Sequence, residues 1–232
     1  MPERSPPGRF PEAESYRAIA TYDPVCGEAE AYLYGLIRPG QKYEIDTVKR
    51  LLALLGDPQR ACAWVQIGGT NGKGSTAATL AAVLLASGRR TGLFTSPHLV
   101  RLRERSRVDG EAMTREELAA LVPALRDSIC EIESQRGEPP SFFEALFALS
   151  CLHFQARGIE IAVAEVGLGG RLDATTALTP LVTALTTVSW DHVATLGPTL
   201  ADIAREKCGI AKPGVPFLSA IRDAELAACV DR

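Results

Sequence analysis

The chain has 232 residues, a length that fits one large α/β domain or two small ones. Its 25 Lys and Arg against 28 Asp and Glu give a formal charge of −3, so there is no basic surplus to neutralise nucleic-acid phosphates. With 46% apolar and 23% charged residues, the composition is that of an ordinary globular protein. No apolar run approaches the ~20 residues of a membrane helix. We therefore expect neither a nucleic-acid-binding nor a membrane protein.

The first residues and the cysteines indicate a cytoplasmic protein. The N-terminus lacks the apolar stretch of a signal peptide, and residues 1–24, polar and rich in proline, are expected to form a loose leader. None of the six cysteines pairs with another at CxxC spacing, which favours reduced thiols. Residues 25–232 are expected to form the folded part.

After this leader, helical and extended patterns begin to alternate. A helix is expected from Glu28, and apolar spacing predicts a second over residues 47–56. Residues 63–67 are typical of a buried strand. A helix rich in Ala and Leu follows over residues 75–87, and residues 91–94 form a second short strand.

Two capping boxes predict where the next helices begin. Thr114 and Glu117 open a helix over residues 114–135, which contains Pro123, and Ser141 and Glu144 open another that runs to residue 157. Strands are then expected at residues 159–166, 181–188 and 216–221, with a helix at 198–212. This alternation predicts an α/β fold with a doubly wound, mostly parallel sheet.

The strongest local signal is a glycine loop between the first strand and the next helix. Backbone N–H groups of such a turn can converge on phosphate oxygens, and the helix N-terminus adds positive potential. Lys73 can reach the β- and γ-phosphates, and the Ser75 hydroxyl can approach Mg²⁺. The spacing departs from Walker A because residue 67 is Ile and an extra glycine separates Lys73 from Ser75. The residues of this loop are Gly69, Thr70, Asn71, Gly72, Lys73, Gly74 and Ser75.

Further polar groups follow other strands, where ligands of open α/β sheets bind. The segment TSPH begins at residue 95, directly after a strand. Glu165 closes an apolar strand, a position unsuited to core packing and suited to holding a cation. Among the histidines, His192 is the expected ligand, while His153 is expected in the core or on the surface. By itself, Lys207 is typical of a solvated surface residue.

Together these segments resemble the Mur ligase superfamily, and within it the folylpolyglutamate synthase/dihydrofolate synthase branch. The resemblance implies a P-loop NTPase-like central ATPase domain, truncated before the C-terminal Rossmann-like domain that carries the rest of the ATP and glutamate sites. The 232 residues are therefore expected to be an N-terminal portion. The matching segments are GTNGKGS (69–75), TSPHL (95–99), FFE (142–144), EVGLGGRLDAT (165–175), DH (191–192), LGPTLADIAREK (196–207) and GIAKPG (209–214).

The resemblance further implies an ATP-dependent amide ligase. A carboxylate of dihydropteroate or folate would take the γ-phosphoryl group of ATP, and the amine of L-glutamate would attack the resulting acyl phosphate. Cations dominate such a site because two anions must be aligned against their repulsion. ATP would be the co-substrate and Mg²⁺ the metal, and the full-length ligase is expected to be a monomer.

Site residues carry over position by position. The triphosphate would lie on residues 70–75, with Lys73 on it. Ser96, Glu165 and His192 would be magnesium ligands, and Lys207 matches a lysine that relatives carry as a carbamate. Lys73, Lys207 and His192 would be catalytic. The segments that would border the pteridine are Ser141, Phe142, Phe143 and Glu144, together with Leu172, Asp173 and Ala174.

Departures from the family pattern leave alternatives open. The family usually has Asn where this chain has Thr176, and Ala where it has Cys208. A cell-wall precursor Mur ligase, a truncated non-catalytic nucleotide-binding module, and a generic P-loop kinase or GTPase remain alternatives. The sequence does not decide between dihydrofolate synthase, folylpolyglutamate synthase and both. The isolated chain is expected to hold nucleotide and Mg²⁺ weakly without ligating.

Overall fold

A computed structural model of the protein describes residues 27–38 and 44–223, so the predicted leader lies outside the described residues. Seven strands form one sheet in the order β4-β3-β2-β5-β1-β6-β7. Neighbours from β2 to β7 pair in parallel, and β3 and β4 are antiparallel. The predicted mostly parallel α/β sheet is confirmed. The strands are β1 (Ala63–Gly68), β2 (Thr91–Phe94), β3 (Ser106–Val108), β4 (Glu111–Ala112), β5 (Ile161–Glu165), β6 (Val182–Leu185) and β7 (Phe217–Ser219).

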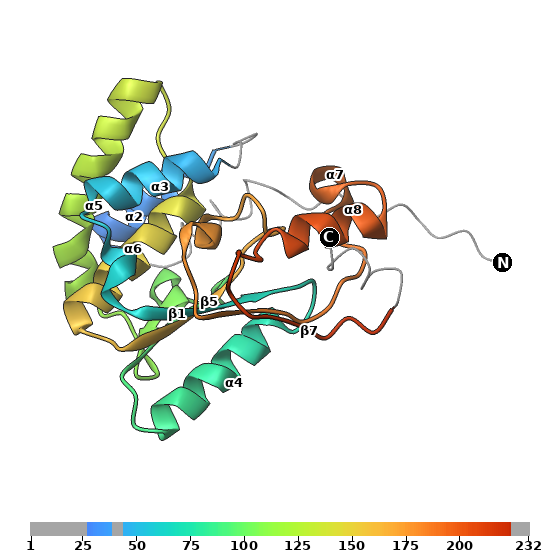
Figure 1. Ribbon diagram of the computed structural model, residues 1–232. Coiled ribbons are helices and arrows are strands. Elements are labelled where there is room, and N and C mark those ends of the chain that lie inside the picture. Colours follow the sequence, from blue (N-terminus) through green and yellow to red (C-terminus); the bar gives the residue numbers. More distant parts are fainter. Residues whose placement is uncertain (1–26, 39–43, 224–232) are drawn as a thin grey trace.

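Helices cover both faces of this sheet (Figure 1). One layer contains α2 (Glu28–Tyr34), α3 (Ile45–Leu54), α5 (Arg115–Arg136) and α6 (Phe142–Arg157), while α4 (Lys73–Ala86) lies on the opposite face. Beside the carboxyl end of β6 lie α7 (Val193–Leu196) and α8 (Leu200–Cys208). The 3-10 turns are η1 (Pro58–Ala61), η2 (Leu102–Arg105) and η3 (Ala174–Ala177). Within the described ranges, no helix combines the length and apolar character needed to cross a membrane.

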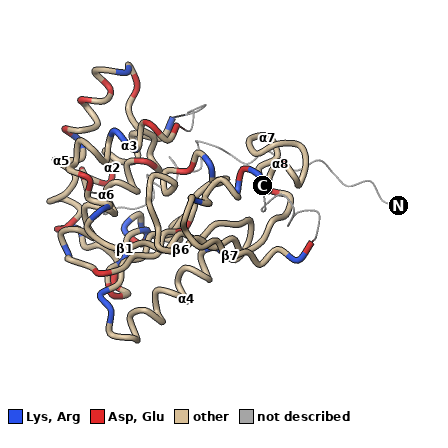
Figure 2. Tube along the Cα trace, in the orientation of Figure 1, with Lys and Arg blue, Asp and Glu red and all other residues tan. Residues whose placement is uncertain are grey.

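The larger core lies between the sheet and the four-helix layer. The ring of Trp64 on β1 packs between Phe147 and Phe154 of α6, with ring centroids 6.0 and 5.7 Å away. A smaller cluster under α4 joins side chains of β1 and β5 to Ala77 and Ala81. Beyond Lys73, α4 carries no charged residue, and its tube is tan in Figure 2. The tube of α5, in contrast, carries both blue Lys or Arg and red Asp or Glu residues.

The capping boxes fix two helix starts as predicted. The hydroxyl of Thr114 accepts the N–H of Glu117 and that of Ser141 accepts the N–H of Glu144, while each glutamate accepts the N–H of its partner. Both helices end at a glycine in the left-handed conformation, Gly137 and Gly158.

Two local predictions were wrong and one hairpin was missed, each because of a tertiary contact or a short turn. The last helix ends at Cys208 rather than residue 212, because Gly209 packs so tightly on Arg171 that a Cβ there would overlap the Arg171 side chain. The strand expected to reach residue 188 ends at Leu185. The β3–β4 hairpin was not predicted; its turn places Asp109 and Gly110 at φ 51° and 87°, between two very short, charged flanks.

His153 lies in the core, one of the two places expected for it. Its side chain is 1% exposed, its Nδ1 lies 2.9 Å from Ser106 Oγ, and its Nε2 lies 3.5 Å from Glu117 Oε2. Burial lowers the pKa of His153 below its usual value of 6.5, although the nearby Glu117 opposes this shift. The fold therefore favours the neutral imidazole.

This preference predicts a pH-dependent stability. As pH falls through about 6.5, the unfolded chain binds a proton on His153 before the folded chain does, so the free energy of unfolding should decrease, by at most about 1.4 kcal/mol per pH unit. Urea unfolding between pH 7.5 and 5 should show this decrease in the wild type and a shallower one in His153→Leu. Parallel curves for the two proteins would contradict the assignment.

Candidate functional site

Four loops meet at the carboxyl ends of the parallel strands. The glycine loop (residues 69–75) follows β1, residues 95–101 follow β2, residues 166–173 follow β5, and residues 186–192 follow β6. Because parallel strands end at the same edge of a sheet, these loops are brought together although the first and the last are more than 100 residues apart in sequence. Most of the residues predicted from the sequence lie on these loops, while Lys207 is contributed by α8 (Figure 1).

The glycine loop is pinned to the segment that leaves β6. Thr70 N donates to Thr187 O at 2.7 Å, and the hydroxyl of Thr186 donates to Asn71 O at 2.7 Å. Gly69 has φ 135°, and a Cβ at this position would overlap Thr186 Oγ1. The loop therefore has a fixed shape that only glycine permits at this residue.

Beyond this anchor the loop opens into the N-terminus of α4. The first N–H groups of a helix have no partner within it, and here they belong to Lys73, Gly74 and Ser75. The ammonium of Lys73 reaches back to donate to Thr70 O at 3.0 Å. This end of α4 offers N–H donors, a positive helix dipole and a cation in one place.

Glu165 lies directly against the glycine loop. A Cβ on Gly74 would stand 3.3 Å from both carboxylate oxygens, and Ser96 N donates to Glu165 Oε2 at 3.0 Å. The residue is only 5% exposed. Burial raises the pKa of Glu165, while the N–H of Ser96 and the charges of Lys73 and Arg105 act to lower it. A buried oxygen donor of this kind fits a hard divalent cation.

A second polar chain leads from the surface to the start of the glycine loop. His192, at φ 41° and half exposed, places Nε2 3.3 Å from Asp191 Oδ1. The other oxygen of Asp191 lies 3.4 Å from Lys207 Nζ, which also donates to Gly69 O at 3.2 Å. Lys207 is 2% exposed, so it is not the solvated residue that its local sequence suggests. Burial lowers the pKa of its amine, and Asp191 opposes that shift.

The first residues of α6 pack into the hydrophobic core and also contact the loop that follows β5. Phe142 stacks on Tyr34 with centroids 5.6 Å apart, and Phe143 lies 5.6 Å from Phe94. Phe143 also lies so close beneath Gly167 that a Cβ on that glycine would overlap its ring. Aromatic packing from α6 thus supports the loop that follows Glu165.

Asp173 shapes this same loop. Its buried carboxylate accepts the N–H groups of Gly167, Leu168 and Thr175 at 2.9, 3.0 and 3.0 Å. Burial raises the pKa of Asp173, and these hydrogen bonds counteract the shift. Leu172 beside it is half-buried and Ala174 is buried.

The structure joins the predicted residues in two groups. One contains Lys73, Ser96 and Glu165, and the other contains His192 and Lys207. In the described part of the chain, no three His, Cys, Asp or Glu side chains are gathered in a way that could hold a metal ion. Sequence reasoning missed the bridging role of Asp191, although its place beside His192 was a signal.

Arg105 was also missed, since nothing in its local sequence sets it apart from its arginine neighbours. It is 4% exposed, and its Nε donates to His98 Nδ1 at 2.9 Å. Burial and the charge of Arg105 lower the pKa of His98 to about 4.

Comparison with known proteins identifies relatives. No family model matches the chain. A probable bifunctional folylpolyglutamate synthase/dihydropteroate synthase of Haloferax volcanii is 43% identical over 192 residues, which cover 83% of this chain and 23% of that protein. The dihydrofolate synthase/folylpolyglutamate synthase of Bacillus subtilis is 35% identical over 199 residues, covering 85% and 46% respectively. The chain belongs to the folylpolyglutamate synthase/dihydrofolate synthase family.

The solved structures agree with this family in fold. E. coli FolC in complex with DHPP and ADP is 30% identical, with a TM-score of 0.77 over 87% of this chain and 48% of that chain. The chain thus spans between about a quarter and a half of the length of these relatives.

Replacing the pinned glycine should separate steric overlap from backbone strain. Gly69→Ala should lower the free energy of unfolding by more than about 2 kcal/mol, because the new methyl group overlaps Thr186 at a positive φ. The matched control Gly88→Ala, at φ 86° with nothing within 4 Å, should cost only about 1 kcal/mol. Equal losses in urea unfolding would show that the contact with Thr186 is unimportant.

Proposed function

We propose that this chain carries the nucleotide-binding and phosphoryl-transfer portion of an ATP-dependent ligase that joins L-glutamate to dihydropteroate or a folate. The observation that carries the proposal is the close approach of Gly74 in the glycine loop to the buried carboxylate of Glu165. A phosphate-binding loop (residues 69–75) and a carboxylate that can bind a cation then lie side by side, as phosphoryl transfer requires. The relative solved with DHPP and ADP supports the nucleotide, and a relative solved as an FPGS-AMPPCP-folate complex supports the folate.

Within this proposal, the triphosphate lies on the glycine loop at the N-terminus of α4. Lys73 leaves Thr70 O and turns to the phosphates, since a phosphate oxygen is a stronger acceptor for an ammonium than a carbonyl. The loop needs little rearrangement because its contacts with Thr186 and Thr187 already set its shape. Gly69 through Ser75 form this phosphate-binding loop.

Glu165, Ser96 and His192 are the proposed ligands of Mg²⁺. The buried carboxylate of Glu165 is the hard oxygen donor such an ion prefers, and phosphate oxygens and water would complete the shell. When bound, Mg²⁺ offsets the charge on the transferring phosphoryl group. The two protein sides of this site are the Ser96–Glu165 contact and the Asp191–His192 pair.

Lys207 is the proposed carbamate. Its buried amine has a lowered pKa, which raises the fraction in the neutral, nucleophilic form. The neutral amine would add to CO₂ and release one proton, giving an N-carboxylate in place of a cation. The new anion would lie near Asp191, and the repulsion between them favours a metal cation between the two groups.

Ligation then follows in two steps. An oxygen of the acid substrate's carboxylate attacks the γ-phosphorus and ADP leaves; the amine of L-glutamate attacks the acyl carbon and phosphate leaves, with loss of a proton from the amine. Lys73 offsets charge in the first step. Residues 141–144 and 172–174 are proposed to border the pterin. A cytoplasmic location and a monomeric full-length ligase belong to the same proposal.

Nucleotide binding tests this function. The 232-residue chain should bind the ATP analogue AMPPCP in the presence of Mg²⁺, and Lys73→Met should weaken the affinity by about 10- to 100-fold, because it removes a charge-assisted contact. Lys49→Met, at a lysine on α3 outside the site, should not change it. Isothermal titration measures both. Absence of binding by the wild type, or equal affinities of the two variants, would overturn the nucleotide site. The same isolated chain should form no glutamate-dependent ADP.

Neutralising Glu165 should separate stability from metal binding. Burial raises the pKa of Glu165 and so disfavours its ionised form in the folded protein, and Glu165→Gln should therefore leave the free energy of unfolding unchanged or raise it by up to about 1 kcal/mol. The same change should abolish the Mg²⁺-dependent gain in AMPPCP affinity. Glu206→Gln, which alters an exposed pair with Arg171, is the control. A retained Mg²⁺ effect would exclude Glu165 as a ligand.

A further inference from the structure

One polar side chain interrupts the apolar sequence of the interior strand β1. Gln66 is fully buried and pairs in register with Ala164 of β5 on one side and with Thr183 of β6 on the other. Because side chains two residues apart share one face of a strand, Gln66 points to the same face as Trp64, which packs against α6. A buried amide in such a place is explained by where its hydrogen bonds go.

The amide of Gln66 binds two threonines of η3. Its Nε2 lies 2.9 Å from Thr175 Oγ1 and 3.3 Å from Thr176 Oγ1. A hydroxyl has one hydrogen, and each of these two already donates it elsewhere. Thr175 donates to the carboxylate of Asp173 at 2.5 Å. Thr176 donates to Gly170 O at 2.7 Å. Both hydroxyls can therefore only accept from Gln66, which donates its two amide hydrogens.

The two hydroxyls pass this contact on to the loop of residues 166–173, which follows β5. Asp173, next after Thr175, accepts the N–H groups of Gly167 and Leu168 at 2.9 and 3.0 Å. Gly170 O, next after Thr176, lies in the middle of the same loop. Hydrogen bonds in such a chain polarise and strengthen one another. The interior strand β1 thus fixes the loop at two points.

The other end of the amide brings no such contact. Among the residues that the structure describes, Gln66 Oε1 and the neighbouring Thr183 Oγ1 are buried side-chain oxygens without a hydrogen-bond partner. A buried acceptor without a partner destabilises the folded state, so the sheet would tolerate an apolar side chain of similar size equally well. What Gln66 supplies is therefore the pair of donors to η3.

We propose that Gln66 is a positioning residue, which through Thr175 and Thr176 holds the loop of residues 166–173 in the shape that the acid substrate requires. The proposal rests on the proposed function, in which residues 172–174 border the pterin. Gln66 itself stays in the core and meets no ligand. Because the loop begins directly after Glu165, its shape also sets what lies beside this proposed metal ligand.

Amide hydrogen exchange tests this contact without any ligand. In the ¹⁵N-labelled 232-residue chain, the N–H groups of Gly167 and Leu168 should exchange slowly. Gln66→Met has a side chain of similar length without a donor, and it should speed their exchange at least about 10-fold, because the loop opens more often. The N–H of Val166 bonds Ile67 O at 2.9 Å, outside this chain of hydrogen bonds, and should keep its rate.

The matched control is Thr183→Val. It changes an equally buried neighbour of Gln66 to a side chain of the same shape, and it cuts no link to the loop, so exchange at Gly167 and Leu168 should not change. Thr175→Val cuts the next link and should speed this exchange. In that background Gln66→Met should add less than in the wild type, because both changes act through one chain.

Thermal unfolding separates positioning from stability. Gln66→Met and Thr183→Val should each keep the melting temperature within about 4 °C of the wild type, since each removes an oxygen that lacks a partner in the described part of the chain.

Binding of dihydropteroate tests what the loop does. Gln66→Met should weaken dihydropteroate about 10-fold and leave the affinity for AMPPCP within about 2-fold, because the glycine loop is held by Thr186 and Thr187 instead. Thr183→Val should change neither affinity. Isothermal titration of the 232-residue chain measures both ligands.

The outcomes separate this proposal from the proposed function. Unchanged exchange at Gly167 and Leu168 in Gln66→Met overturns the proposal, as does faster exchange with unchanged dihydropteroate affinity. Equal weakening of both ligands, or a large fall in melting temperature, means that Gln66 is merely structural. If the wild type binds AMPPCP without dihydropteroate, the role of the loop in substrate binding fails for this chain. If it binds neither, the proposed function fails, and the exchange rates alone decide whether Gln66 holds the loop.

Discussion

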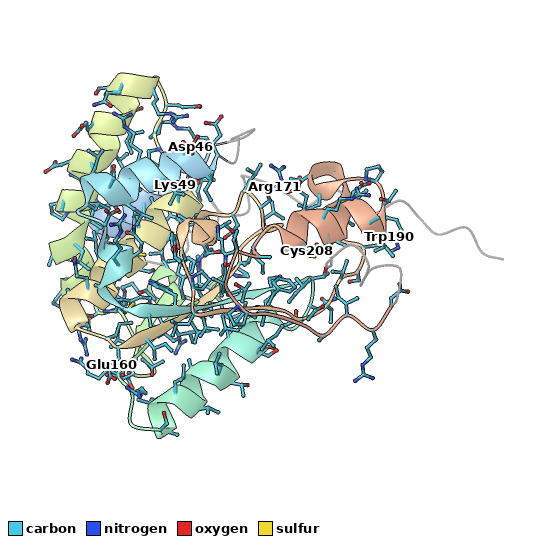
Figure 3. The ribbon with its side chains drawn as sticks, in the orientation of Figure 1. Asp46, Lys49, Glu160, Arg171, Trp190 and Cys208 are labelled. Atoms are coloured by element: carbon cyan, nitrogen blue, oxygen red, sulfur yellow. The ribbon has the colours of Figure 1, made fainter. Side chains whose placement is uncertain are left out.

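A carboxylate almost removed from water sets the geometry of the site. Glu165 ends β5, the central strand between β2 and β1, so its side chain emerges where the surrounding loops meet. Burying a charge is costly unless donors and cations face it. Ser96 N supplies a hydrogen bond, and Lys73 and Arg105 supply positive charge from two sides. Gly74 has no side chain where one would crowd the carboxylate. Arg171, in the loop after β5, and Cys208 on α8 are labelled in Figure 3, and the two elements are joined where Arg171 N donates to Glu206 O at 2.8 Å.

The glycine loop depends in turn on how β6 ends. Thr186 and Thr187 leave the strand to bond the loop, which is why β6 stops at Leu185. Ser189 continues the contact by donating its N–H to Thr70 Oγ1 at 3.1 Å. The same segment then supplies Asp191, which reaches Lys207. The segment that leaves β6, residues 186–192, thus fixes the shape of the glycine loop and also positions Asp191 beside Lys207.

Sequence patterns predicted the parts of the fold that local chemistry decides. The capping boxes at Thr114 and Ser141 and the buried strand at 63–67 are local signals, and the structure confirms them. The ends of β6 and α8 could not be predicted, because contacts with the glycine loop and with Arg171 stop these elements. The candidate site follows the same division. Lys73 and Glu165 stand out locally, whereas the place of Arg105 depends on tertiary contacts, among them those with His98 and Phe142.

Two buried cations of the site, Lys207 and Arg105, have chemically different partners, and this difference matters for the proposed ligation. Lys207 lies beside a carboxylate and has a lowered pKa, so its charge is locally offset and removable. Arg105 keeps its proton at any physiological pH and is held by a neutral imidazole, so its charge is permanent and undiminished by that partner. A γ-phosphate and a substrate carboxylate repel each other as they approach. The removable charge of Lys207 lies on the side of Asp191 and His192, where the proposed metal could replace it, whereas the charge of Arg105 stays near Glu165 whatever the state of Lys207.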